Sequence, residues 1–153
     1  HLWKILGLAT RAGIIASFAA MMISVLIQVF ARFFLESAPS WTEEMARIFF
    51  VFSVAFGAGL AVKEGAYIFL DSLIHWFKPR LKRIIDLFSK IAVLLVSAFM
   101  LWYSFDFVAI GTLETSPAMN INMGYVFASM SVMGIMIGIY VVIDIFKKNR
   151  DIY

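Results

Sequence analysis

The chain contains no cysteine and only two histidines, His1 and His75, among its 153 residues. The first absence excludes a disulfide framework, a thiolate metal site and a cysteine nucleophile. Neither histidine lies within a long apolar stretch, so a haem-binding helical bundle would lack its axial ligands. A Ser-His-Asp set, a carboxylate cluster and a glycine-rich phosphate loop are also missing. We therefore expect no catalytic activity, no metal site and no cofactor.

Charged residues are scarce, at 15% of the chain against 63% hydrophobic residues, and they gather in a few short stretches. A membrane core about 30 Å thick needs roughly 20 mostly apolar residues in a helix. The sequence offers four such stretches, at about 12–32, 42–63, 90–113 and 121–144. It predicts an all-α integral membrane protein, one domain over residues 1–153. We interpret His1, in place of a methionine, as an artefact of expression or processing.

Residues 66–78 have a different pattern, because apolar and polar side chains fall on opposite sides of a helix. Phe69, Leu73 and Phe77 share one side, and Asp71 and His75 share the other. A helix of this length reaches only about 20 Å and is too short to span a bilayer. The pattern predicts an amphipathic helix that lies in the plane of the membrane interface.

The basic residues predict the orientation of the chain. Eleven of the 13 fall on the side shared by the two termini and the 66–78 segment: Lys4, Arg11, Lys63, Lys78, Arg80, Lys82, Arg83, Lys90, Lys147, Lys148 and Arg150. Only Arg32 and Arg47 fall on the other side. Because short cytoplasmic loops are enriched in Lys and Arg, we expect both termini, and the in-plane helix, on the cytoplasmic side of a cell membrane.

Two polar residues lie inside the predicted spans. Gln28 continues a stripe of small residues, Ala12, Ala16, Ala20 and Ser24, which we expect to pack against protein. Asp106 lies in the third span, where an ionised carboxylate costs about 3 kcal/mol and needs a partner or a proton. Arg32 and Arg47 are its candidate partners. In the fourth span, Gly134 and Gly138 form a further helix-packing pattern.

Charged residues mark both ends of the second span. At its start, Ser40 or Thr42 is expected to cap the helix, and Glu43 and Glu44 stand four and three residues before Arg47, the spacings of helical ion pairs. At its other end, Lys63, Glu64 and Asp71 are expected to fix the bend into the in-plane helix. The charged residues at each end could serve as a structural anchor or as a docking site for another protein.

Residues 41–47 read WTEEMAR, residues 57–65 read GAGLAVKEG, and Asp71 follows. In this order they resemble the small membrane subunit of tripartite ATP-independent periplasmic (TRAP) transporters. The resemblance implies a bacterial or archaeal inner-membrane uptake system with a large membrane subunit and a periplasmic substrate-binding protein. It also implies sodium-coupled uptake of organic acids of the C4-dicarboxylate or sialic acid type, with sodium and substrate sites in the large subunit. The small subunit would act as a scaffold and help to receive the binding protein.

Carried over residue by residue, Trp41, Glu43, Glu44 and Arg47 match the outer motif of that family, and Glu64 and Asp71 match its inner motif. The resemblance implies that these residues serve assembly or docking. One departure is that Ala66 and Tyr67 follow the Glu-Gly pair, where the family often has a histidine.

Two alternatives stay open. The chain could be an autonomous small transporter or channel, working as a homo-oligomer with Gln28 and Asp106 along its path. It could also be an assembly or sensor protein whose cytoplasmic basic cluster binds anionic lipids or a partner. Membrane lipids are expected neighbours in each case, and no feature calls for nucleic acid.

Overall fold

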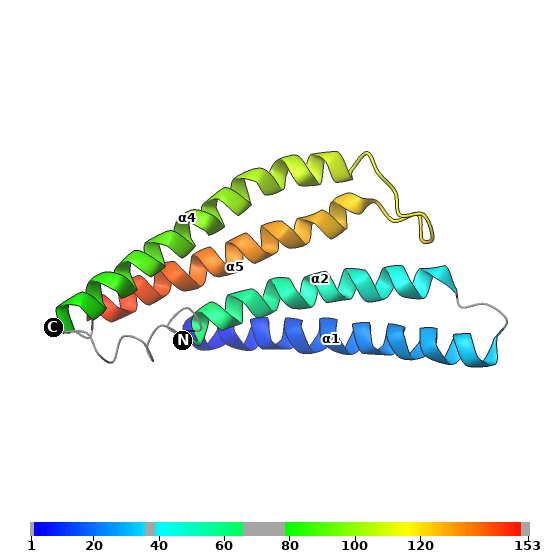
Figure 1. Ribbon diagram of the computed structural model, residues 1–153, viewed down its shortest axis with the longest axis horizontal. Helices are drawn as coiled ribbons and strands as arrows, with labels where there is room; N and C mark the ends of the chain where they lie inside the picture. The colour runs from blue at the N-terminus through cyan, green and yellow to red at the C-terminus, as the bar shows by residue number, and fades with distance from the viewer. Residues whose placement is uncertain (1, 36–38, 66–78, 151–153) are drawn as a thin grey trace.

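The computed structural model describes residues 2–35, 39–65 and 79–150, which form four long helices (Figure 1). Helix α1 covers Leu2–Phe34, α2 covers Ser40–Lys63, α4 covers Pro79–Gly111 and α5 covers Met123–Arg150. Each is long and apolar enough to cross a membrane. The prediction of an all-α protein with four transmembrane helices is therefore confirmed. The amphipathic helix predicted at 66–78 lies outside the described residues.

Local sequence signals explain where several of these helices begin and end. Pro79 is the first residue of α4, a position where the missing N–H costs nothing. Asn122 precedes α5, and its side-chain oxygen accepts the Gly124 N–H at 2.8 Å, as a capping residue does. Gly65 follows α2 with a φ of 78°, which glycine adopts without strain. Helix α4 begins about ten residues before the predicted span, so Asp86 and Lys90 lie within it.

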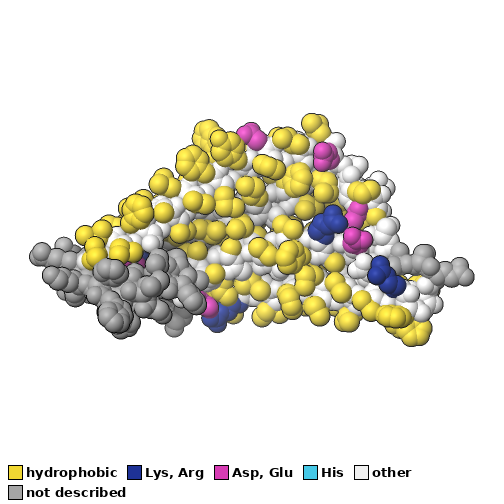
Figure 2. Space-filling model, in the orientation of Figure 1, with side chains coloured by type: hydrophobic (Ala, Val, Ile, Leu, Met, Phe, Trp, Pro, Cys, Tyr) yellow, Lys and Arg dark blue, Asp and Glu magenta, His cyan; other side chains and the backbone are white. Residues whose placement is uncertain are grey.

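The four helices lie side by side in one layer, in the order α1, α2, α5, α4 (Figure 1). Each helix packs on its neighbour in this row, which places α1 and α4 at opposite edges. Such a layer has two broad faces, and few apolar side chains of the described residues are buried between its helices, among them Tyr140 and Val141 of α5. In the most apolar stretches of α1, α2 and α4 only 11% of the residues are buried, against 28% in α5. Figure 2 shows hydrophobic side chains along the length of one such face.

Small residues line the contacts within the row. Ser24 and Ala31 of α1 are buried, Thr10 of α1 is buried against Tyr140 of α5, and Ser97 and Ser104 are buried on the α5 side of α4. Small side chains let membrane helices approach closely, where dispersion contacts replace a hydrophobic driving force.

Glycines allow the closest approaches. A Cβ at Gly59 would lie 2.7 Å from the Cβ of Met136 on α5, and one at Gly134 would lie 3.3 Å from the Ser97 carbonyl oxygen of α4. Gly134 and Gly138 therefore face α4, as their spacing indicates. Ala12 and Ala16 are exposed, so the first two turns of the predicted stripe on α1 do not pack within this chain. The buried face follows a seven-residue spacing instead, and Gln28 is half-buried beside it.

Candidate functional site

Polar side chains gather at the two ends of the row. We call the end with the α4–α5 loop the loop end, and the end where α1 begins and α5 ends the basic end (Figure 1). All of the predicted outer-motif residues lie at the loop end, in the first two turns of α2. Glu64 lies at the basic end, and Asp71 lies outside the described residues.

Glu44 joins α2 to the α4–α5 loop. Its carboxylate accepts a hydrogen bond from the Ser116 hydroxyl and two more from the backbone N–H groups of Ala118 and Met119, at 3.0 and 3.1 Å. Ser116 is 2% exposed. Hydrogen bonds to a charged acceptor are stronger than neutral ones. One side chain thus links the α1–α2 pair to the α4–α5 pair.

The loop that Glu44 holds has an ordered backbone of its own. The Ser116 N–H donates to the Ile121 carbonyl at 2.8 Å, and the Asn120 N–H donates to the Ser116 carbonyl at 2.9 Å. Asn120 has a φ of 52°, a left-handed conformation that Asn tolerates better than most residues. The turn presents two adjacent N–H groups to the same side, which is how backbone amides form a seat for an anion.

Glu43 and Arg47 form the helical ion pair that their spacing indicates, with 3.4 Å between Glu43 Oε1 and Arg47 Nη2. Both side chains are more than 60% exposed, so each remains available to a partner. Trp41 is also exposed, on the first turn of the same helix. Glu43 and Arg47, but not Trp41, line an open cavity of about 440 Å³ between α2 and the loop. It is lined by Ser40, Glu43, Glu44, Arg47, Ile48, Ser116, Pro117, Ala118, Met123 and Val126.

The expected side-chain cap of α2 is absent. The residue before the helix is Pro39, and no side chain caps the first turn. Thr42 is fully buried, and its hydroxyl donates to the Pro39 carbonyl at 2.7 Å instead of accepting from the backbone. The prediction that Ser40 or Thr42 caps this helix is therefore wrong. Thr42 fixes the entry of the chain into α2.

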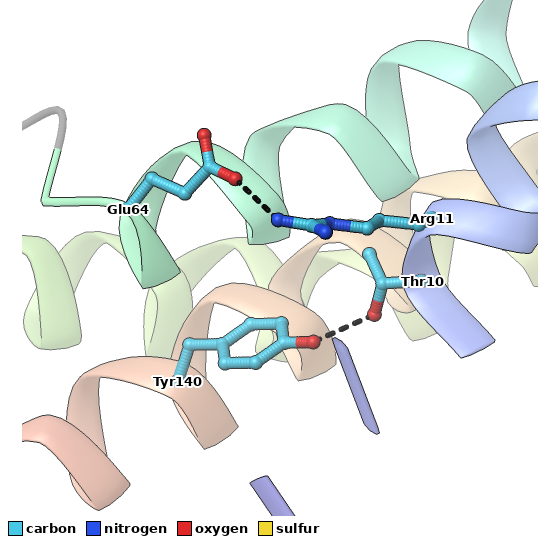
Figure 3. A network of polar contacts seen from close by, with 4 residues as sticks. All are labelled: Thr10, Arg11, Glu64 and Tyr140. Carbon is cyan, nitrogen blue, oxygen red and sulfur yellow. Dashed lines mark hydrogen bonds and ion pairs between the residues drawn. The ribbon is translucent and has the colours of Figure 1, made fainter. Parts of the chain in front are cut away.

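At the basic end, α1 is tied to the end of α2, its neighbour in the row, and also to α5 (Figure 3). Arg11 Nη2 lies 3.1 Å from Glu64 Oε1, just after α2 ends. One residue earlier, the Thr10 hydroxyl lies 2.7 Å from the hydroxyl of Tyr140 on α5, and both residues are buried. Lys63 lies over Gly7 of α1, where a Cβ would collide with its ammonium group. Glu64 thus anchors α1, which its position in the sequence does not reveal.

A buried charge cluster holds α4 to α5 at the same end. The Lys90 side chain is 3% exposed, and its ammonium group lies 2.7 Å from Asp144 on α5 and 3.3 Å from Asp86 one turn earlier on α4. The sequence places Lys90 among the basic residues on the side of the termini but does not predict its burial between two carboxylates. Asp86 and Lys90 stand four residues apart, a spacing that favours an ion pair on a helix. The contribution of Asp144 depends on helix neighbours that the sequence does not show.

Asp106 does not meet either of its candidate partners. It is exposed on α4 at one edge of the row, whereas Arg32 is on α1 at the other edge and Arg47 pairs with Glu43. Among the described residues, Asp106 forms no hydrogen bond or ion pair. The expectation of a pair with Arg32 or Arg47 is therefore wrong, because α1 and α2 are not neighbours of α4.

Comparison with known proteins identifies the family. Residues 21–151, which include all of α2 and α4, match the model of the DctQ component of tripartite ATP-independent periplasmic transporters. The chain belongs to the DctQ family. It is also 22% identical over 120 residues to a TRAP transporter small permease protein of Haemophilus influenzae, covering 78% of this chain and 73% of that protein. The resemblance of residues 41–47 and 57–65 thus extends over most of the molecule.

Membership of the DctQ family makes this chain a small subunit of a TRAP transporter and a multi-pass membrane protein. The members of this family are transporter components, and the family is not one of enzymes. Its name implies a system with two further components. In this DctQ subunit, the charged side chains of the outer motif divide into a group that holds the molecule together, Glu44, and a group exposed to partners, Glu43 and Arg47.

Proposed function

We propose that this DctQ subunit is the static scaffold of a sodium-coupled transporter that takes up organic acids of the C4-dicarboxylate or sialic acid type. The large membrane subunit would carry the sodium and substrate sites and move the substrate. The periplasmic binding protein would deliver it. The chain itself would add membrane surface against which the large subunit works.

The single layer of helices is the observation that carries this proposal. A self-sufficient transporter needs helices that enclose a path and a site near the middle of the membrane. Here the main packing is between adjacent helices of the row, with a further contact from Thr10 of α1 to Tyr140 of α5, and most apolar side chains face outward. Such a layer has two broad apolar faces to offer to lipid and to a larger membrane protein.

The loop end is proposed to face the periplasm and to help receive the binding protein. The basic residues at the opposite end favour the cytoplasm for that end and for both termini. Glu43 and Arg47 are exposed at an open cavity and offer both signs of charge, and Trp41 is exposed on the first turn of the same helix. Glu44 would act indirectly, because it holds residues 116–119 in place beside them.

Uptake in proteoliposomes tests the scaffold role. The measurement compares this chain alone, the large subunit with the binding protein, and all three components, with a labelled organic acid and an inward sodium gradient. We expect uptake only from the complete set. Uptake by this chain alone would instead support an autonomous transporter. Equal uptake without this chain would show that no scaffold is needed.

The docking role has a separate test, the affinity of the binding protein for the reconstituted pair of membrane subunits. We expect Arg47→Ala and Glu44→Ala to weaken this affinity, the first by removing an exposed charge and the second by releasing the loop. Glu114→Ala is the matched control, because Glu114 is an exposed carboxylate near the same loop. Equal losses in all three variants would contradict a specific docking site and indicate a general charge effect.

A further inference from the structure

The two edges of the row differ in a way that distinguishes lipid from protein. The outward side of α1 carries Leu8, Ile15, Leu26 and Phe33, all more than half exposed. Between Arg11 and Arg32 this helix has no charged residue. An uncharged apolar surface of this kind suits lipid chains.

The outward side of α4 is also apolar, but it contains a carboxylate. Ser97 and Ser104 face α5, and Asp106 lies two residues after Ser104, which turns it about 200° around the helix and away from the row. Phe99, Trp102 and Ile110 point the same way and are 63%, 74% and 55% exposed. We call these residues, with Asp106, the α4 edge. Figure 2 shows hydrophobic side chains over α4 along this side of the molecule.

Asp106 lies inside the apolar part of the helix. It is five residues before Gly111, the last residue of α4, or about 8 Å along the helix axis. Aromatic and aliphatic side chains surround it on the same side, and it forms no hydrogen bond or ion pair among the described residues. Ionisable groups within a membrane segment are costly unless another group satisfies them. If the α4 edge faced only lipid, the Asp106 carboxylate would therefore have no group to satisfy it.

We infer that the α4 edge seats a membrane-spanning helix of the large subunit, and that this helix places a Lys or Arg side chain opposite Asp106. This inference rests on the proposed function. It adds which surface of the chain contacts the large subunit and which charge the large subunit supplies there. Charge complementarity selects this occupant over a second copy of the chain. Two copies related by a twofold axis through this edge would bring the Asp106 carboxylates toward each other.

Site-directed crosslinking tests which edge contacts the large subunit. Because the chain has no cysteine, Trp102→Cys on α4 and Leu26→Cys on α1 each provide a single attachment point for a photoreactive maleimide. The two positions lie at similar distances from the loop end of their helices. We expect a crosslink to the large subunit from position 102 and not from position 26. A crosslink from position 26 alone, or from position 102 to a second copy of this chain, would overturn the inference.

Charge reversal tests the partner's charge. In the complex with a tagged large subunit, Asp106→Lys is expected to lower the recovery of this chain about tenfold or more, since like charges would then face each other in the membrane. Asp106→Asn should lower it less, because the amide still accepts a hydrogen bond. Glu114→Lys, an equal change of charge in the exposed loop, should have no effect.

The failure of this inference can be told apart from the failure of the scaffold proposal. Gel filtration of each variant alone shows whether it is folded, and the crosslinking variants leave Asp106 in place. If folded Asp106→Lys is recovered like the parent, the basic partner is wrong while the scaffold role stands. If the parent chain is not recovered with the large subunit at all, and transports by itself, both proposals fail.

Discussion

The two ends of the molecule are held by different means. At the loop end a single carboxylate, Glu44, accepts three hydrogen bonds from a loop more than 70 residues away in the sequence. At the basic end several pairs share the task, and they range from the buried Lys90 cluster to the exposed Arg11–Glu64 pair. The loop end therefore depends on one residue, whereas the basic end can lose an outer contact and keep its inner ones.

Burial, more than the number of ion pairs, should decide which contacts stabilise the fold. A pair removed from water leaves an uncompensated charge when one partner is lost, whereas an exposed pair is replaced by water at little cost. Single substitutions at the two ends should therefore destabilise the protein in proportion to how buried the removed groups are.

The largest effect is expected at Lys90. Lys90→Met would remove the buried ammonium group that contacts Asp86 and Asp144, and we expect a loss of about 3 kcal/mol in the free energy of unfolding. Unfolding of the purified protein in detergent measures this loss. Arg32→Met is the control, because Arg32 is exposed at the loop end of α1. Equal stabilities of the two variants would show that the buried cluster does not hold the basic end.

The contact between the two helix pairs can be tested in the half of α2 nearer the basic end, with two of its glycines. Gly59→Ala would bring a Cβ within 2.7 Å of the Met136 Cβ, so α2 and α5 must separate, at a cost of about 1–3 kcal/mol. A Cβ at Gly57 meets nothing within 4 Å, and Gly57→Ala should be neutral or stabilising by up to about 1 kcal/mol. Unfolding of both variants under the same conditions checks the difference. A stable Gly59→Ala would contradict the close packing.

Glu44 should have a smaller effect on unfolding than Lys90, because two of the three groups that it releases belong to the half-buried residues Ala118 and Met119. Glu44→Gln replaces the carboxylate with an amide and is expected to accelerate hydrogen exchange at Ala118 and Met119, whose N–H groups it accepts. The α4–α5 contact at the basic end should keep its protection. Glu43→Gln is the control, since Glu43 contacts only Arg47 among the described ion pairs at this end. Unchanged hydrogen exchange at Ala118 and Met119 in Glu44→Gln would show that the loop backbone is stable without the Glu44 carboxylate.

The sequence predicts the helices well because each is determined locally. A run of apolar residues long enough for the bilayer requires a helix, since lipid offers no hydrogen bonds to the backbone. The pair of Glu43 and Arg47 is equally local, because one turn of helix joins them. Family membership followed from the motif residues of α2, and it extends over residues 21–151.

The sequence does not predict which helices are neighbours. Leu and Phe side chains pack on lipid nearly as well as on protein, so an apolar pattern carries little information about helix order. Glu44 with Ser116, Thr10 with Tyr140, and Lys90 with Asp144 all depend on that order. Because the helix order was unknown, Arg32 and Arg47 were predicted as partners for Asp106. A closed bundle would bring these helices together, whereas the row separates them.

The smallest effect is expected for the Arg11–Glu64 pair, although it is the most visible contact at the basic end (Figure 3). Both side chains are more than half exposed, and Arg11→Ala should lower the free energy of unfolding by about 0.5 kcal/mol or less. Tyr140→Phe, which removes the buried hydroxyl beside it, should have a larger effect, about 1 kcal/mol. Unfolding in low and high salt separates the two, because salt screens an exposed ion pair and leaves a buried hydroxyl contact unchanged. If Arg11→Ala proves the more damaging and its effect vanishes in salt, then surface charge holds α1 at this end, and the ranking by burial fails.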